Sequence, residues 1–294
     1  MLFTAGHLDK HIYKSVETDA DCVVLDLEDA VPPNMKDEAR NKIRDVLENG
    51  TFDRKPVMVR INPMDTGLTL LDLDVVACEK LNGFIFPKAY TADDIKSFDA
   101  QLSLKEKTLG LPDGHFEVVI LIETAQAVLH AFDMAVATKR TIGLLFGSED
   151  YLADTKGLHD ENALSLHVPR NLVVLAARAA RVIPIDTPFV EVHDMEGYAR
   201  HLRQGRNLGF EGILIMSPRQ IEGANDIYSP GDEEVEVARE IVRLADQARA
   251  EGRGIAMYNG TFISPPTEKQ ARVILDFHES FKAYLKFCGK KKER

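Results

Sequence analysis

Eight short apolar runs, each followed by a stretch of helical periodicity, constrain the fold of this 294-residue chain more than any other feature. Each run is apolar on consecutive residues, which is typical of parallel strands buried on both faces. The runs span residues 1–4, 22–27, 56–61, 83–87, 117–122, 142–146, 188–192 and 212–216. Eight strand–helix units predict an α/β fold, the (β/α)8 or TIM barrel. A doubly wound sheet favours fewer strands and a glycine-rich loop after the first strand, which this sequence lacks.

The composition changes after the eighth run. A Ser-Pro-Gly-Asp segment at 229–232 precedes a predicted helix over 233–250, and a glycine-rich connector leads to a last helix that begins after Pro265 and Pro266. Two helices are too few for a hydrophobic core of their own. We therefore predict a TIM-barrel catalytic domain over 1–230 and a C-terminal helical extension over 231–294 that packs on a neighbouring subunit.

Charge and cysteine content exclude several classes of protein. The formal net charge of −11 disfavours nucleic-acid binding, which needs a basic surface. Cys22, Cys78 and Cys288 lack the spacing of a disulfide framework or a metal site. No apolar run reaches the roughly 18–20 residues of a membrane span, and the N-terminus does not resemble a secretory signal. We expect a cytoplasmic protein that binds neither nucleic acid nor a membrane.

Charged residues at the ends of the second, third and fourth runs are candidates for function, because barrel enzymes build their sites there. Asp26, Glu28 and Asp29 lie at or just after the end of the second run; helix capping accounts for one of them, and three buried unpaired carboxylates are costly. Arg60 ends the third run among apolar residues and must reach a buried anion, either a partner such as Asp26 or a substrate carboxylate. Lys88 follows the fourth run, and this position at a strand end favours a place at the barrel mouth over one on the outer surface.

Two further carboxylates, Glu123 and Asp150, follow the fifth and sixth runs. Neighbouring strand ends place them about one strand spacing apart, which suits Mg²⁺ because that ion takes one or two protein carboxylates and leaves other positions to water and substrate. No His or Cys cluster accompanies them, which argues against zinc. A pairing of Glu123 with Arg60 or Lys88, without a metal, is the alternative that the spacing leaves open.

Seven segments, in their order and spacing, resemble the citrate lyase β-subunit family within the HpcH/HpaI aldolase superfamily. They are LDLEDAV at 25–31, VRINP at 59–63, PKA at 87–89, LIET at 121–124, FGSEDY at 146–151, IDTP at 185–188 and the stretch from GFEG to PRQI that ends at 221. The resemblance implies a Mg²⁺-dependent barrel, usually a trimer, that cleaves or forms a carbon–carbon bond. It also implies a hydroxyacyl-CoA substrate such as citryl-, malyl- or citramalyl-CoA, which yields an acyl-CoA and a 2-oxo acid.

The resemblance further implies roles for individual residues. The implied catalytic residues are Asp26, Glu28, Arg60 and Lys88, the implied substrate-binding residues are Arg60, Gly147 and Ser148, and the implied metal ligands are Glu123 and Asp150. Arg60 holds the carboxylate of the oxo acid in this interpretation. Asp26 and Glu28 act as acid–base or supporting groups, with Lys88 beside them.

Three regions depart from the family's pattern. Ala5 and Gly6 replace a Pro-Gly pair that helps to receive the nucleotide, and Leu214 and the segment 216–218 replace a Lys and an Ile-His-Pro triplet. In the connector, Asn259 replaces an Asp that, by the resemblance, serves the neighbouring subunit's site as proton donor or hydrolytic residue. Because Asn is neither an acid nor a base, we predict little or no thioester hydrolysis.

Two alternatives to the CoA-ester lyase follow from these departures. The changes at Ala5, Ser217 and Asn259 are compatible with a CoA-independent class II aldolase whose product is a 2-oxo acid. A non-catalytic degenerate barrel is the second alternative, and the retention of Arg60, Glu123 and Asp150 argues against it.

Overall fold

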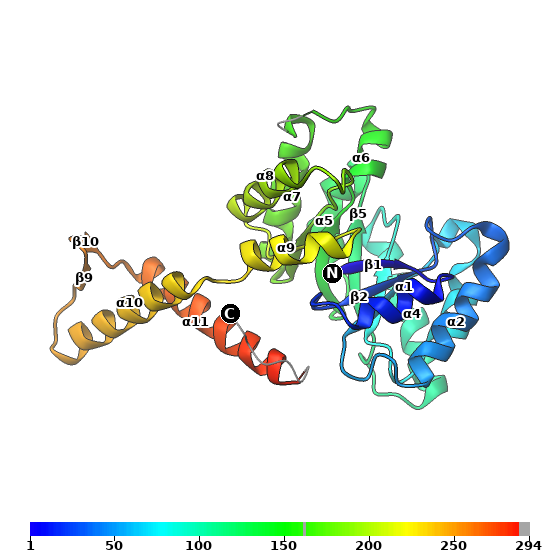
Figure 1. Ribbon diagram of the computed structural model, residues 1–294, viewed down its shortest axis with the longest axis horizontal. Helices are drawn as coiled ribbons and strands as arrows, with labels where there is room; N and C mark the ends of the chain where they lie inside the picture. The colour runs from blue at the N-terminus through cyan, green and yellow to red at the C-terminus, as the bar shows by residue number, and fades with distance from the viewer. Residues whose placement is uncertain (161–162, 288–294) are drawn as a thin grey trace. The chain divides into compact units, whose positions relative to one another are not determined.

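The computed structural model describes residues 1–160 and 163–287, and it contains a parallel sheet in which each strand pairs with the next along the chain (Figure 1). The eight strands that this part of the chain contributes to the sheet are β1 (Leu2–Ala5), β2 (Val23–Asp26), β3 (Val57–Arg60), β4 (Gly83–Phe86), β5 (Glu117–Ile122), β6 (Thr141–Phe146), β7 (Ile183–Asp186) and β8 (Gly212–Ile213). A parallel bridge joins Leu2 to Ile215, and the N–H of Phe3 donates to the carbonyl of Ile215 at 2.9 Å. These bonds close the sheet, so the predicted TIM barrel is confirmed.

Helices connect successive strands and cover the outside of the barrel. They are α1 (Asp9–Val16), α2 (Lys36–Glu48), α3 (Thr69–Val76), α4 (Ala92–Leu109), α5 (Ala125–Ala135), α6 (Ser148–Thr155), α7 (Leu164–Ala180), α8 (Met195–Leu208) and α9 (Ile221–Tyr228). Single 3-10 turns precede α2, α3 and α9, at η1 (Pro33–Met35), η2 (Met64–Thr66) and η3 (Pro218–Gln220). Within the described residues, no helix combines the length and the apolar character needed to cross a bilayer.

Branched and unbranched aliphatic side chains fill the barrel interior. One buried cluster takes side chains from β2 through β7 and from the segment after β8: Val24, Met58, Ile85, Val119, Leu121, Leu145, Ile185 and Leu214. Each strand gives consecutive residues alternately to this interior and to the layer beneath the helices, which explains why the strands read as continuously apolar.

The seventh predicted strand is wrong in position. β7 covers Ile183–Asp186, while the predicted run at 188–192 lies in the following loop, where Val190 is exposed. Pro184 lies within β7 and lacks an N–H to donate, but its carbonyl still accepts the N–H of Glu211 at 3.0 Å. The correction places Asp186 and Thr187 at the mouth of the barrel.

The chain from Asn225 onward forms a second compact unit, and Met1–Ala224 form the first. The second unit contains α10 (Asp232–Ala250), the hairpin strands β9 (Met257–Tyr258) and β10 (Thr261–Phe262), and α11 (Pro265–Phe287). Its small apolar cluster consists of Ala245, Ala248, Ala256 and Ile263. The predicted boundary at 230 and the packing on a neighbouring subunit stay predictions.

A two-residue turn joins β9 to β10. Tyr258 pairs with Thr261, and the intervening Asn259 and Gly260 have φ values of 48° and 77°. Positive φ at both central residues is the signature of a type I′ turn, for which Asn-Gly is the favoured sequence. The turn therefore gives Asn259 a conformational reason to be present, separate from any chemical role.

Candidate active site

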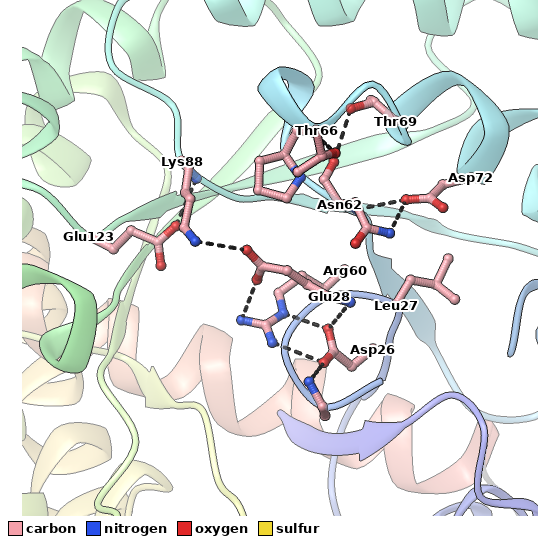
Figure 2. Close-up of polar contacts among 12 residues, drawn as sticks. Asp26, Leu27, Glu28, Arg60, Asn62, Thr66, Thr69, Asp72, Lys88 and Glu123 are labelled. Atoms are coloured by element: carbon pink, nitrogen blue, oxygen red, sulfur yellow. Dashed lines mark hydrogen bonds and ion pairs between the residues drawn. The ribbon is translucent and has the colours of Figure 1, made fainter. Parts of the chain in front are cut away.

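Four predicted residues meet at the C-terminal ends of β2, β3 and β4 (Figure 2). The guanidinium of Arg60 binds the carboxylate of Asp26 through two contacts, Nε to Oδ1 at 2.6 Å and Nη2 to Oδ2 at 2.9 Å. Its Nη1 lies 2.8 Å from Oε2 of Glu28, and Lys88 Nζ lies 3.5 Å from the other Glu28 oxygen. The ring of Phe3 lies under the guanidinium, 4.5 Å from ring centre to Cζ. Both carboxylates are thus held by cations.

The register of the sheet creates the pair of Asp26 and Arg60. These residues end β2 and β3 and lie directly opposite each other. Asp26 is fully buried and also accepts the backbone N–H groups of Glu28 and Ala30, at 3.0 and 2.8 Å. Four donors on one carboxylate offset the cost of burying its charge. The loop after β2 is therefore fixed to the end of β3.

Glu28 has the environment of an acid–base group. Its side chain is only 5 % exposed. Burial raises the pKa of Glu28 to about 7, with a further contribution from Asp29, while Arg60 and Lys88 act in the opposite direction. A carboxyl group that titrates near neutral pH both accepts and releases protons readily.

Glu123 lies directly after β5, against the end of β6. Its Oε1 accepts the backbone N–H of Lys88 at 2.7 Å, and Lys88 has a φ of 48° that turns this N–H toward the carboxylate. A Cβ at Gly147 would lie 2.8 Å from the Cβ of Glu123, so only glycine fits there. Burial raises the pKa of Glu123 to about 8, and Glu28 and Asp150 add to the effect.

Asp150 lies on the first turn of α6, which starts immediately after Gly147. Asp150 is half-buried, whereas Ser148 is 2 % exposed. The backbone N–H of Ser148 donates to Oγ1 of Thr187 at 2.9 Å, across the ends of β6 and β7. Sequence reasoning gave Thr187 no role, although the IDTP segment contained it.

Glu123 and Asp150 fit a magnesium ion by the chemistry of their donors. Lys88 occupies Oε1 of Glu123, and Oε2 is available as a ligand. In residues 1–160 and 163–287 no group of three or more His, Cys, Asp or Glu side chains could hold a metal, so a metal here would depend on two carboxylates. Mg²⁺ accepts such a site, and water and substrate oxygens complete its shell. Burial and the neighbouring carboxylates of Glu28 and Asp150 raise the pKa of Glu123, and a cation between these carboxylates would favour its charged form.

A half-buried lysine that sequence reasoning missed, Lys36, supports the loop of Glu28. Lys36 Nζ donates to the carbonyls of Leu27 and Glu28 and to Oδ1 of Asn62, at 2.6, 2.7 and 2.7 Å. Asn62 is held in turn by Oδ2 of the buried Asp72, which accepts its backbone N–H at 2.7 Å and its side-chain amide at 2.8 Å. A cavity of about 620 Å³ opens beside this network, and its lining includes Glu28, Lys36, Asn62 and Lys88. Asn62, in the VRINP segment, is the only sequence feature that points to these contacts of Lys36.

The departures from the family's pattern also have structural explanations. Leu214 packs into the barrel-interior cluster, so the end of β8 offers no cation at that position. Ser217 caps the turn that precedes α9, because its Oγ accepts the N–H of Arg219 at 3.4 Å. Asn259 belongs to the second unit, and its role at the site stays a prediction.

Comparison with known proteins agrees with these features. Residues 1–218 match the family model described as HpcH/HpaI aldolase/citrate lyase. The chain is 31 % identical over 276 residues to a citrate lyase subunit beta from Haemophilus influenzae, covering 94 % of this chain and 95 % of that protein. It is also 31 % identical to an L-malyl-CoA/beta-methylmalyl-CoA lyase from Cereibacter sphaeroides, covering 93 % and 92 % of the two chains.

A solved structure extends the likeness to three dimensions. The CitE protein of Mycobacterium tuberculosis, in complex with magnesium, acetoacetate and coenzyme A, matches with a TM-score of 0.75 and 26 % identity, covering 95 % of this chain and 97 % of that one. Both sequence relatives are carbon–carbon lyases. On the family match and on identity over nearly its whole length, this chain belongs to the HpcH/HpaI aldolase/citrate lyase family.

Proposed function

We propose that the protein is a Mg²⁺-dependent carbon–carbon lyase that cleaves or condenses a hydroxyacyl-CoA thioester such as citryl-, malyl- or citramalyl-CoA. The products of cleavage are an acyl-CoA and a 2-oxo acid. The observation that carries this proposal is the convergence of Glu28, Arg60, Lys88 and Glu123 at one barrel mouth, with a carboxyl group that titrates near pH 7 among them. The names of the two relatives and the bound groups in the CitE structure support it.

Glu123 and Asp150 are the residues proposed to hold the metal. When bound, Mg²⁺ supplies positive charge that stabilises the negative charge on the oxygens of the oxo acid. Gly147 has no Cβ and so leaves room for the Glu123 side chain, and Ser148 is the first residue of α6, whose first turn carries Asp150.

Glu28 is the proposed base. Cleavage requires that the substrate hydroxyl lose its proton while the carbon–carbon bond breaks and its electron pair passes to the acyl-CoA enolate, which is then protonated. Arg60 and Lys88 orient the Glu28 carboxylate from two sides. A guanidinium has five N–H donors; Asp26 accepts hydrogen bonds from two of them and Glu28 is ion-paired with Nη1, so Arg60 retains donors for the carboxylate of the oxo acid.

We further propose a cytoplasmic homotrimer in which the connector around Asn259 reaches a neighbouring barrel. Apolar side chains exposed on the second unit support an additional protein surface: Ile255, Met257, Phe262, Val273 and Phe277. Cys22 and Cys78 are free thiols, in keeping with a reducing compartment, and Cys288 lies outside the described residues.

One assay separates this function from the two alternatives. The purified protein is incubated with Mg²⁺ and, separately, with malyl-, citramalyl- and citryl-CoA, and the acyl-CoA product is measured by chromatography. Cleavage that EDTA abolishes and that Glu28→Gln reduces supports the lyase. Cleavage of a free 4-hydroxy-2-oxo acid but of no CoA ester would indicate the class II aldolase, which the apolar Leu214 at the end of β8 favours. No turnover of either class would indicate a non-catalytic barrel.

A further inference from the structure

The first turn of α6 carries Asp150 but has no side-chain cap of its own. The N-cap residue is Gly147, which offers no polar side chain, so an N–H of the first turn must find its acceptor elsewhere. Thr187, on the neighbouring strand end, supplies that acceptor: its Oγ1 lies 2.9 Å from the backbone nitrogen of Ser148. The same hydroxyl donates to Oγ of Ser148 at 2.7 Å. One buried hydroxyl therefore holds both the main chain and the side chain of the residue two positions before Asp150.

Contacts with the end of β7 and with two helices, α7 and α8, hold Thr187 in place. Its backbone N–H donates to Oδ1 of Asp186 at 2.9 Å, and the fully buried Asp186 carboxylate pairs with Arg170 of α7. The Nε2–H of His201, on α8, donates to the carbonyl of Thr187 at 3.2 Å. Thr187 is 1 % exposed, so its side chain is largely shielded from bulk solvent. This network fixes the hydroxyl on the side that faces α6.

Glu123 meets the same segment from the other side. It packs against Gly147, and the N–H of Gly147 donates to the carbonyl of Ile122 at 2.9 Å. The end of β6 is thus bonded to β5 through Gly147 and to β7 through Ser148. The separation between the Glu123 and Asp150 carboxylates depends on both attachments.

We propose that Thr187 is a positioning residue that sets Asp150 for metal binding through the first turn of α6. The proposal rests on the magnesium site proposed above. Residues that orient metal ligands typically change metal affinity 10- to 100-fold when they are replaced. Loss of the Thr187 hydroxyl leaves the N–H of Ser148 buried without its acceptor, and the turn must shift to satisfy it.

The test compares Mn²⁺ binding, measured from the electron paramagnetic resonance signal of the free ion, in the wild type and in three variants. Thr187→Val keeps the shape and removes the hydroxyl; we expect Mn²⁺ affinity to fall about tenfold or more. Thr187→Ser restores the hydroxyl and should bind within about twofold of the wild type. Thr141→Val is the matched control, because Thr141 is also a buried threonine but its Oγ1 has no hydrogen-bond partner among the described residues.

The same variants separate positioning from a general structural role. In an activity assay, Thr187→Val should raise the KM for Mg²⁺ by a similar factor and leave kcat at saturating Mg²⁺ nearly unchanged, whereas a stability defect alone leaves the KM of the folded fraction unaltered. Wild-type affinity in a folded Thr187→Val variant would overturn the role of Thr187, as would equal losses in Thr187→Ser and Thr187→Val. A wild type that binds no Mn²⁺ would overturn the magnesium site itself.

Discussion

Replacing Glu123 by Gln should stabilise the metal-free protein at alkaline pH and abolish its response to magnesium. Burial raises the pKa of Glu123 to about 8, from an ordinary value of 4.5. The folded state therefore binds a proton more tightly than the unfolded state does, and the free energy of unfolding must fall as pH rises from about 4.5 to about 8. Gln carries no charge at any pH, and its amide oxygen still accepts the N–H of Lys88.

The size of the effect follows from these two pKa values. At about 1.4 kcal/mol per pKa unit, the contribution of Glu123 to the free energy of unfolding declines by roughly 3 kcal/mol between pH 5.5 and pH 8.5. Glu28, whose pKa is raised to about 7 by burial, gives a slope of the same sign in both proteins. The difference between wild type and variant therefore measures Glu123 together with its coupling to Glu28.

Urea unfolding in EDTA at the two pH values measures this difference. The wild type should lose about 3 kcal/mol relative to Glu123→Gln, and in excess Mg²⁺ at 100 times its Kd the wild type alone should regain about 2.7 kcal/mol. Glu117→Gln is the matched control, since Glu117 starts the same strand but is exposed. Parallel pH dependences in the wild type and Glu123→Gln would refute the electrostatic reasoning, and equal Mg²⁺ stabilisation would refute the ligand assignment.

Three further predictions concern the chemistry and the second unit. Glu28→Gln should lower kcat by about 10²- to 10⁴-fold, and its pH–rate profile should lack the rise of activity through about pH 7. Its Mn²⁺ affinity should stay within about twofold of the wild type. An unchanged pH–rate profile would exclude Glu28 as the base. Arg60→Lys keeps the charge but loses the paired contacts with Asp26, so it should weaken oxalate binding in the presence of Mg²⁺ and cost about 1–3 kcal/mol of stability; calorimetry and urea unfolding check both, and wild-type oxalate affinity would remove the role of Arg60. Asn259→Asp should raise hydrolysis of a CoA ester at unchanged metal affinity, because Asp-Gly also suits a type I′ turn; robust hydrolysis by the wild type, followed by thiol release, would contradict the prediction.

The barrel and the position of its mouth could be predicted from the sequence because burial on both faces leaves a readable pattern. Charged residues that end such runs, as Asp26 and Arg60 do, necessarily come to one edge, and the register then pairs them. The same rule failed at the seventh strand, where Pro184 interrupts the expected composition and a loop carries apolar residues instead. That error hid Thr187 from the candidate site.

Other contacts depend on loop conformation, which residue spacing does not encode. Lys36 reaches Asn62 because the loop after β2 folds back over the end of β3, and no periodicity predicts that return. The position of Lys88 at a strand end predicts a role at the barrel mouth, yet Lys88 bonds Glu123 through its backbone N–H, in a left-handed conformation that is uncommon for lysine.

The turn between β9 and β10 makes the connector susceptible to deamidation. Asn259 and Gly260 are both exposed, and the backbone nitrogen of a glycine attacks the preceding Asn side chain with little steric hindrance, releasing ammonia and leaving Asp or isoaspartate after hydrolysis. The attack requires the backbone to leave the left-handed geometry that the hairpin imposes on both residues. The rate of deamidation at Asn259, measured by peptide mass spectrometry, therefore reports how often this hairpin opens. Because the product includes the very side chain tested by Asn259→Asp, stored preparations will gradually acquire the variant's chemistry, and hydrolysis must be measured on freshly purified protein.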